Sequence, residues 1–484
     1  MPGGSFSVSR LGTWGVTERG EKLDYQAALR RLLTLTDYER MSAAGAGQPQ
    51  TGLARMFAFL ERLDNPHTCV PAVHIAGTKG KGSTAVLCAS ALSAQGYSVG
   101  LYTSPHLHSF RERIQVDGKP LTEEEFASLV EELWPVAEDF KATGQYGGVT
   151  LFEMLTAMAF WHFRRRELDF QVLEVGLGGR LDATNVVKPE VCVITSLSLD
   201  HTSILGDTLE QITREKAGII KEGACVVSAP QPPAARQVLK EVCEAHATPI
   251  IELDKNLSWT RGEASLEGQS FRVKGRLGSY DLWVPLMGDH QLENAAVAVA
   301  VLEALRERGV EVTPEALARG FSRVEWPCRM EVLRRRPLVV ADGAHNPYSA
   351  GRLRQAVLSY IPARRVILVC GVSIGHHIGM VTELAPLSSL AVATRSRHPR
   401  SMEASAVADA FRKHGLATWQ TENVRDAVVQ ALEVATARDL ILVTGSLFVA
   451  AEAREFLKGI VGEVYPEFQY GLSSAEPALQ VSHG

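Results

Sequence analysis

The chain has 484 residues, of which 45% are hydrophobic and 22% are charged. This length allows large buried cores and exceeds one ordinary domain, so we expect two or three domains. A formal net charge of -5 excludes the strongly basic surface that draws proteins to nucleic acid. The expected partners are small molecules.

The seven cysteines are scattered, and none belongs to a C-x-x-C pair. This pattern favours reduced thiols over a disulfide framework or a zinc site. The first residues lack the apolar core of a signal peptide, and no run of 18 apolar residues occurs. We therefore expect a cytoplasmic protein without a membrane partner.

The first elements lead to a glycine-rich turn. Residues 1–24 are a polar extension, and apolar residues recur at helical spacing over 25–35 and 52–63. A buried strand is then predicted to end at Ile75, and a helical pattern opens at Thr84. Between them lies the sequence GTKGKGST, residues 77–84.

This turn has the composition of a phosphate-binding loop. Its glycines let backbone N–H groups turn inward, and the following helix adds its positive end. Lys81 would lie between phosphates, and the Ser83 hydroxyl would bind Mg²⁺. Because Gly82 separates the lysine from the hydroxyl residue, the spacing departs from the common P-loop, and a glycine-rich turn without nucleotide is the alternative.

A second strand, 97–103, ends at Ser104, which would contact metal or substrate there, or would only cap the local turn. Helices are predicted over 123–142 and 150–164. The strand 171–175 carries Glu174, a costly residue to bury unless it is paired or bound to a metal. The strand 191–196 leads to His201, and a short helix covers 214–221.

The later part of the chain changes character twice. Residues 249–287 alternate with period two, which predicts a small antiparallel insert, and a helix begins near residue 288. Residues 325–337 are loop-like and indicate a domain boundary. Beyond them, strands at 338–341, 366–370, 390–394 and 440–444 alternate with helical stretches, which favours a parallel α/β sheet. Residues 471–484 are a polar tail.

Together these motifs resemble the folylpolyglutamate synthase and dihydrofolate synthase family, in its bacterial bifunctional form, within the ATP-dependent Mur ligase superfamily. They run in the family's order over residues 25–460. They are GTKGKGST (77–84), TSPH (103–106), LEVGLGGRLDATN (173–185), DH (200–201), EKAGIIK (215–221), HQLEN (290–294), DGAHNP (342–347) and TGS (444–446).

The resemblance implies an α/β fold in two domains. A P-loop ATPase domain, 25–328, would hold a mainly parallel sheet and the antiparallel insert, and a smaller Rossmann-like domain, 329–470, would follow. It implies a monomeric ligase that uses ATP and Mg²⁺. The enzyme would add L-glutamate to dihydropteroate, to reduced folates, or to both, through an acyl phosphate.

Residue roles follow from the matching motif positions. The implied ATP contacts are Gly77, Thr78, Lys79, Gly80, Lys81, Gly82, Ser83 and Thr84 in the loop, with Asn294, Arg329, Asp342 and His345 elsewhere. The implied metal ligands are Ser83, Glu174 and His201, and the implied catalytic residues are Lys81, Lys216 and His201. Phe152, Asp182 and Ala183 match pterin-binding positions.

Structural alternatives stand beside these roles. Glu174 could belong to a buried ion pair, and His201 could be a hydrogen-bonded core histidine. Asp342 could lie in a plain turn, and Arg329 could be a surface residue between the domains. Phe152 could be an ordinary core residue. His376 and His377 replace an Asp-Lys-Asp loop found in many family members, and would contact glutamate or phosphate or only solvent.

Lys216 lies 15 positions after His201 (216 − 201), a spacing that resembles the family's carbamylated lysine. A carbamate would supply an anionic oxygen near the metal. The alternatives are an unmodified phosphate-binding lysine and a solvated one. Two other functions stay open: a dedicated polyglutamate synthase, and a P-loop ATPase without ligase chemistry.

Overall fold

The computed structural model describes residues 22–37, 52–374 and 377–463. Most of the predicted extension and all of the predicted tail lie outside this part of the chain. None of the helices within these ranges is long and apolar enough to cross a membrane.

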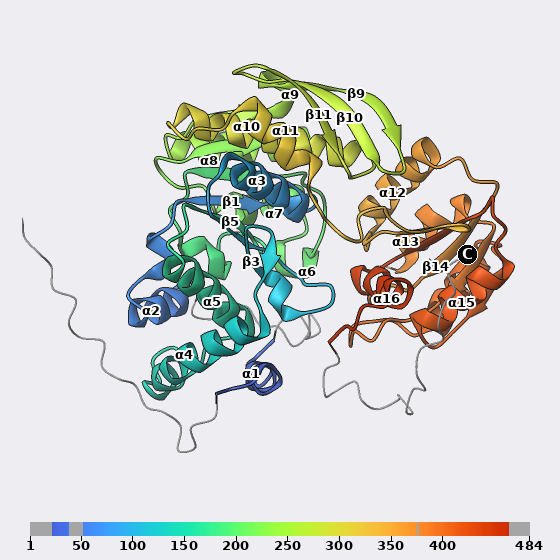
Figure 1. The fold of residues 1–484 in the computed structure, drawn as a ribbon, viewed down its shortest axis with the longest axis horizontal. Helices are drawn as coiled ribbons and strands as arrows, with labels where there is room; N and C mark the ends of the chain where they lie inside the picture. Colours follow the sequence, from blue (N-terminus) through green and yellow to red (C-terminus); the bar gives the residue numbers. More distant parts are fainter. Residues whose placement is uncertain (1–21, 38–51, 375–376, 464–484) are drawn as a thin grey trace, which may run out of the picture.

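The first sheet has eight strands in the order β4-β3-β2-β5-β1-β6-β7-β8 (Figure 1). Neighbours from β2 to β8 pair in parallel, whereas β3 and β4 add an antiparallel edge. The bounds are β1 (Ala72–Ala76), β2 (Val99–Tyr102), β3 (Ile114–Val116), β4 (Lys119–Pro120), β5 (Phe170–Glu174), β6 (Val191–Ile194), β7 (Cys225–Ser228) and β8 (Ile250–Glu252).

Helices cover both faces of this sheet, which explains why its central strands β5, β1 and β6 are buried along their whole length. On β1, Val73 and Ile75 join one core, and Ala72 joins the other. The first core includes α3 (Lys81–Gln95), α10 (Asp289–Glu307) and α11 (Pro314–Ser322). The second includes α1 (Tyr25–Leu32), α2 (Ala54–Arg62), α4 (Glu123–Ala142) and α5 (Leu151–Arg165).

The remaining helices of this part are short or lie at its edges. They are α6 (Thr202–Leu205), α7 (Leu209–Ala217), α8 (Pro233–Ala245) and α9 (Leu253–Asn256), with 3-10 turns η1 (Pro66–Thr68), η2 (Phe110–Arg113) and η3 (Ala183–Val186).

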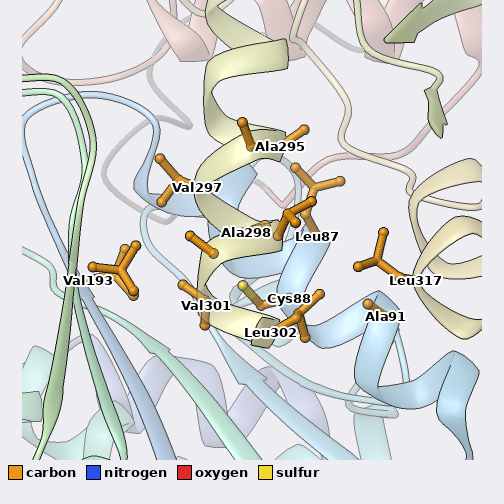
Figure 2. Packing of buried hydrophobic residues seen from close by; sticks show 14 of the residues in the cluster. Leu87, Cys88, Ala91, Val193, Ala295, Val297, Ala298, Val301, Leu302 and Leu317 are labelled. Atoms are coloured by element: carbon orange, nitrogen blue, oxygen red, sulfur yellow. The ribbon is translucent and has the colours of Figure 1, made fainter. Parts of the chain in front are cut away.

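The helix after the glycine-rich turn is held by close packing against α10. Figure 2 shows Leu87 and Cys88 of α3 beside Ala298 and Leu302 of α10, and all four are fully buried. Small side chains on α10 let the two helices approach closely. Each large apolar side chain buried here contributes roughly 1.5–3 kcal/mol. The N-terminus of α3 is thereby fixed relative to the sheet.

A three-stranded antiparallel sheet follows, in the order β11-β10-β9. Its strands are β9 (Ser258–Ser265), β10 (Gly268–Lys274) and β11 (Ser279–Val284). The alternating pattern predicted this insert, although the predicted region also contained β8, which joins the first sheet in parallel.

The last sheet has the order β12-β13-β17-β14-β15-β16, parallel except between β12 and β13. Its strands are β12 (Glu331–Arg335), β13 (Leu338–Ala341), β14 (Val366–Cys370), β15 (Leu390–Ala393), β16 (Thr418–Gln420) and β17 (Leu440–Thr444). Its helices are α12 (Pro347–Tyr360), α13 (His377–Leu384), α14 (Ala404–Lys413), α15 (Val424–Val434) and α16 (Leu447–Lys458), with the turn η4 (Ala385–Leu387). The predicted fold class is confirmed.

Two local predictions were wrong. The helix expected over 214–221 begins at Leu209, because the Thr208 hydroxyl accepts from the Gln211 N–H, and it ends at Ala217. The stretch expected to be a loop at 325–337 contains β12, whose arginines are exposed on an edge strand. Charged edge strands resist unwanted pairing, and their composition resembles that of a loop.

Candidate active site at the end of the first sheet

The turn between β1 and α3 requires glycine at two positions. Gly77 has a φ of +152°, and a Cβ there would lie 1.8 Å from Thr195 Oγ1. Gly80 has a φ of +92° and forms the N-cap of α3, and a Cβ there would lie 2.2 Å from Asn294 Oδ1. Both glycines therefore meet a left-handed conformation and a close neighbour at once.

Not every N–H group of the turn faces outward. The N–H groups of Thr78 and Lys79 both donate to the Ser196 carbonyl, at 2.9 and 3.2 Å. The N–H groups of the first turn of α3 have no intrahelical acceptor by construction, and they carry the positive end of the helix. The Thr84 N–H already donates to the Gly80 carbonyl at 2.9 Å, so an anion would be held by the N–H groups from Gly80 to Ser83.

Lys81 and Glu174 lie together at the N-terminus of α3. Lys81 Nζ is 3.9 Å from Glu174 Oε1, and both side chains are largely buried. Burial raises the pKa of Glu174 above its ordinary value, although Lys81 opposes the shift. The Ser104 N–H donates to Glu174 Oε2 at 3.2 Å, so Ser104 contacts this carboxylate through its backbone. Ser83 is buried one residue beyond Gly82, where a Cβ would lie 3.2 Å from the same carboxylate.

Lys79 links the two halves of the molecule. Its ammonium donates to Asp200 Oδ2 at 3.0 Å and lies 2.7 Å from His345 Nε2. Burial lowers the pKa of Lys79 to about 8. Lys79 and burial lower the pKa of His345 to about 3, so this ring is a neutral acceptor. The Asn346 amide also donates to Asp200 Oδ2, at 2.9 Å.

Lys216 approaches the same turn from α7. Its Nζ donates to the Gly77 carbonyl at 3.0 Å, and the side chain is buried. Burial lowers the pKa of Lys216 to about 7, with a further contribution from Lys81. A large fraction of this amine is thus neutral near physiological pH.

Two other residues predicted to contact the nucleotide, Asn294 and Asp342, are buried in other parts of the fold. Asn294, on α10, is buried against Gly80 and donates to Gln291 Oε1 at 3.1 Å. Asp342, just after β13, accepts from the N–H groups of Met330 and Ala344 at 3.0 and 2.8 Å. Burial raises its pKa.

Arg329 lies beside the segment that follows β13. Its guanidinium donates to the Cys328 carbonyl at 3.0 Å, and a Cβ added to Gly343 would lie 2.7 Å from it. Arg329 is therefore held next to the Asp342–Asn346 segment.

The predicted pterin residues form a separate group near β5. Asp182 is buried and accepts from the Leu177 N–H at 3.0 Å, which closes the loop between them. Ala183 follows it in η3 and is also buried. The Phe152 ring, on α5, covers Gly176, where a Cβ would lie 2.5 Å from its Cζ. Burial raises the pKa of Asp182.

Comparison with known proteins agrees with this geometry. The Mur ligase middle domain matches residues 75–302, and the glutamate ligase domain of Mur ligases matches residues 328–447. The dihydrofolate synthase/folylpolyglutamate synthase of Bacillus subtilis is 36% identical over 412 residues, 84% of this chain and 95% of that protein. The chain belongs to the dihydrofolate synthase/folylpolyglutamate synthase family of Mur ligases.

Two further relatives strengthen the assignment to this family. The Escherichia coli dihydrofolate synthase/folylpolyglutamate synthase is 34% identical over 407 residues, 84% of this chain and 91% of that protein. The structure of Mycobacterium tuberculosis folylpolyglutamate synthase complexed with ADP superposes with a TM-score of 0.82 at 32% identity, covering 90% of this chain and 99% of that one.

A Mur-type ligase implies a divalent metal, and the donor atoms here suit one. Buried Ser83 and Glu174 offer hydroxyl and carboxylate oxygens, the ligands that Mg²⁺ prefers. His201 is less enclosed: its side chain is 41% exposed, with Nε2 4.0 Å from Asp200 Oδ1. Across the described ranges, no three His, Cys, Asp or Glu side chains form a complete metal cluster. The oxygen set fits Mg²⁺ that keeps several waters.

Several contacts of this family site were not predicted from sequence. Asp200 was part of a quoted motif but had no role, and Asn346 was likewise only part of a motif. Trp326 packs its ring 2.6 Å from a Cβ built on Gly82, and its buried Nε1 has no partner in the part of the chain that the structure describes. The prediction for His376 and the His377 side chain lies outside the described residues.

Proposed function

We propose that this protein is an ATP-dependent ligase that joins L-glutamate by an amide bond to dihydropteroate and to reduced folates. Family membership gives the reaction class. The observation that carries the proposal is the contact between Lys79 of the phosphate loop and His345, in the loop after β13 of the last sheet; Lys79 Nζ and His345 Nε2 are 2.7 Å apart. The phosphate loop and the C-terminal end of β13 therefore face each other. A nucleotide bound between two domains needs contacts from both sides in this way.

We assign residues 25–328 to the ATP-binding domain and residues 329–470 to the ligase domain. In this assignment the segment from Gly80 to Ser83 holds the phosphates through helix N–H groups and Lys81. Asn294 lies at the adenine, Asp342 near the ribose and Arg329 at the phosphates. His345 is a further nucleotide contact. Phe152, Asp182 and Ala183 hold the pterin.

The proposed chemistry proceeds in two steps. A carboxylate of the acceptor attacks the γ-phosphorus of ATP, which gives an acyl phosphate and ADP. The amine of glutamate then attacks the acyl carbon, the tetrahedral intermediate collapses, and phosphate leaves as the amide forms. Negative charge accumulates in both steps, so Lys81 and the N-terminus of α3 supply stabilisation where it is needed.

Mg²⁺, when bound, would neutralise charge on the transferred phosphoryl group. Ser83, Glu174 and His201 are the residues that would hold it. We further propose that Lys216 is carbamylated, because its pKa of about 7 leaves enough neutral amine to react with CO₂. The carbamate would be anionic, and would oppose the cationic surplus of Lys79 and Lys81.

One assay tests the function. Purified protein is given ATP, MgCl₂ and L-glutamate with either dihydropteroate or tetrahydrofolate, and the products are read by mass spectrometry. We expect a mass increase of one glutamate with dihydropteroate, and further increases with tetrahydrofolate. Products from tetrahydrofolate alone would identify a dedicated polyglutamate synthase. Phosphate release that needs neither glutamate nor acceptor would identify a P-loop ATPase instead.

We also propose that the protein acts as a cytoplasmic monomer without nucleic acid. Light scattering at assay concentration would report a mass near that of one chain, and a dimer mass would contradict this.

A further inference from the structure

A buried histidine on the central strand is not explained by the phosphate loop. His74 lies on β1, three residues before Gly77, and its side chain is completely buried. Its Nε2 is 2.8 Å from Thr184 Oγ1 on η3. Thr184 Oγ1 in turn lies 2.5 Å from Asp182 Oδ1. Three buried polar side chains therefore connect the central strand to the pterin loop.

The direction of each hydrogen bond follows from counting protons. Burial raises the pKa of Asp182, but the N–H groups of Thr184 and Leu177 donate to its two oxygens at 3.0 Å each and favour the charged form. In that carboxylate form Asp182 has no proton to give. The single hydroxyl proton of Thr184 therefore points to Asp182. Consequently His74 must donate its Nε2–H to Thr184, and its Nδ1 carries a lone pair.

Two further observations agree with this tautomer. His74 Nδ1 is buried, and no described atom partners it, which a lone pair tolerates better than an N–H group does. Burial lowers the pKa of His74 to about 3, so the ring stays neutral. A neutral ring with one proton can donate in only one direction.

We propose that His74 and Thr184 are positioning residues that hold Asp182, and with it the pterin-binding loop, in register with the phosphate loop. This inference rests on the proposed function. Asp182 ties the loop to Leu177, and the Phe152 ring lies against Gly176 at the start of that loop. Because β1 also ends in the phosphate loop, one strand sets the positions of both substrates. The side-chain hydrogen bonds described for His74 and Thr184 run to each other and to Asp182, and not to the phosphate loop, so their effect should be confined to the acceptor.

We call the hydrogen-bonded chain His74–Thr184–Asp182 the relay. A substitution at Thr184 that keeps the side-chain volume tests it. Thr184→Val keeps the volume and the backbone N–H bond to Asp182 but cannot donate from its side chain. We expect its KM for dihydropteroate to rise about tenfold, as loss of one buried hydrogen bond predicts, while its KM for ATP stays within about twofold. Thr184→Ser keeps the hydroxyl and should behave as the wild type.

Two substitutions at His74 form a matched pair, one without and one with a side-chain donor. His74→Leu removes the donor and should reproduce the effect of Thr184→Val, whereas His74→Gln can donate from Nε2 and should restore much of the affinity. His67→Leu is the control, because His67 is also buried with an unpartnered Nδ1 but packs near Phe57 and Phe160. An unchanged acceptor KM in Thr184→Val and His74→Leu, equal changes for ATP and acceptor, or the same effect in His67→Leu would each overturn the relay.

A spectroscopic measurement separates the relay from the function. In full-length protein labelled with ¹⁵N-histidine, the His74 signal, assigned by its loss in His74→Gln, should report the Nε2–H tautomer from pH 5 to 9. Thr184→Val should shift that signal. An Nδ1–H tautomer or a charged ring would overturn the relay even in an active ligase. An inactive wild type would overturn only the function, and the tautomer would still decide the relay.

Discussion

Lys81 combines partial burial with direct access to the charge that develops during phosphoryl transfer. We expect Lys81→Ala to lower kcat by about a thousandfold, because one cation is removed from a site that excludes water. The thermal midpoint should change little, since the ion pair with Glu174 is long, at 3.9 Å. Initial rates and a melting curve measure both quantities.

The control for this substitution is Lys119→Ala, at the first residue of the exposed edge strand β4. It should retain full activity. A folded Lys81→Ala enzyme with near-normal rates would contradict the assignment of the phosphate loop.

Substitutions at Lys216 distinguish a role for its positive charge from a role for a carbamate. Arginine keeps the positive charge but cannot form the carbamate, so we expect Lys216→Arg to be as inactive as Lys216→Ala. Wild-type enzyme prepared in CO₂-free buffer should lose activity and regain it on addition of bicarbonate. Substantial activity in the arginine variant would mean that the positive charge is what the reaction needs.

The lowered pKa of Lys216 also predicts a pH dependence of stability. In the folded protein this pKa is about 7, below the ordinary value of 10.5, so between these values the unfolded chain binds more protons. The free energy of unfolding should therefore rise with pH through this window, in CO₂-free buffer. Lys216→Met should flatten the rise, and urea titrations at pH 6.5 and 9 would measure it.

At the level of a single helix, α3 begins and ends with glycines of similar conformation. Gly80 has a φ of +92° and Gly96 a φ of +112°, so alanine at either position strains the backbone. Only at Gly80 would the new Cβ meet Asn294 Oδ1, at 2.2 Å, whereas nothing lies within 4 Å at Gly96. We expect Gly80→Ala to raise the KM for ATP at least tenfold.

Gly96→Ala is the matched control, and it should lower the thermal midpoint as Gly80→Ala does while leaving the KM for ATP unchanged. Calorimetry and steady-state kinetics on both variants separate strain from loop geometry. An equal rise of the KM for ATP in both variants would show that the kinetics report only the loss of helix stability.

The elements that sequence predicted well carry local signals. The glycine-rich turn, the helix over 123–142 and the apolar strands of both sheets depend on spacing within about 20 residues. Edge strand β12 was missed because its exposed arginines resemble a loop, and β8 because a short apolar run does not reveal its sheet. Pairing partners are set by tertiary contacts that no local pattern contains.

The same limit applies to the site. Asp200 and Asn346 are 146 positions apart, and they lie in the loops that follow β6 and β13, which belong to different sheets. Their contact exists only because the two sheets face each other. Lys81 and Glu174 were predicted as site residues from motifs, but the close approach of Trp326 to Gly82 had no sequence signal, since a tryptophan before a proline is equally typical of a surface loop.

Within the described ranges, several groups of polar contacts join the first part of the chain to the last sheet and its helices. One group links Tyr360 and Arg352 of α12 to Asp289 and Glu293 of α10. Asp200 and Lys79 meet Asn346 and His345 at the site. His108, after β2, lies 3.0 Å from both Glu455 and Arg454 on α16. Arg335 on β12 and Glu267 in the β9–β10 turn form an ion pair at 2.6 Å. Lys79 belongs to the phosphate loop, so its contact with His345 should couple the relative position of the two parts to nucleotide binding.

Replacing the side-chain amide of Asn346 with a carboxylate tests that coupling. Its Oδ1 accepts from the Ser349 N–H at 2.9 Å and caps α12, while its amide donates to Asp200. Asn346→Asp keeps the cap but brings a second carboxylate against Asp200. Although burial alone would raise it, Lys79 and the neighbouring histidines keep the pKa of Asp200 below its ordinary value, so Asp200 stays charged and the two groups repel.

We expect Asn346→Asp to raise the KM for ATP by tenfold or more and to increase the radius of gyration in solution scattering, with little loss of helix content. Asn423→Asp is the control: Asn423 caps α15 and donates to Asp426 at 2.8 Å on its own helix. Figure 1 shows α15 on the side of the last sheet that lies farther from the first sheet. The same charge change there should leave both quantities unaltered. Equal effects in the two variants, or an unchanged radius with a raised KM, would mean that Asn346 acts locally and does not hold the two parts together.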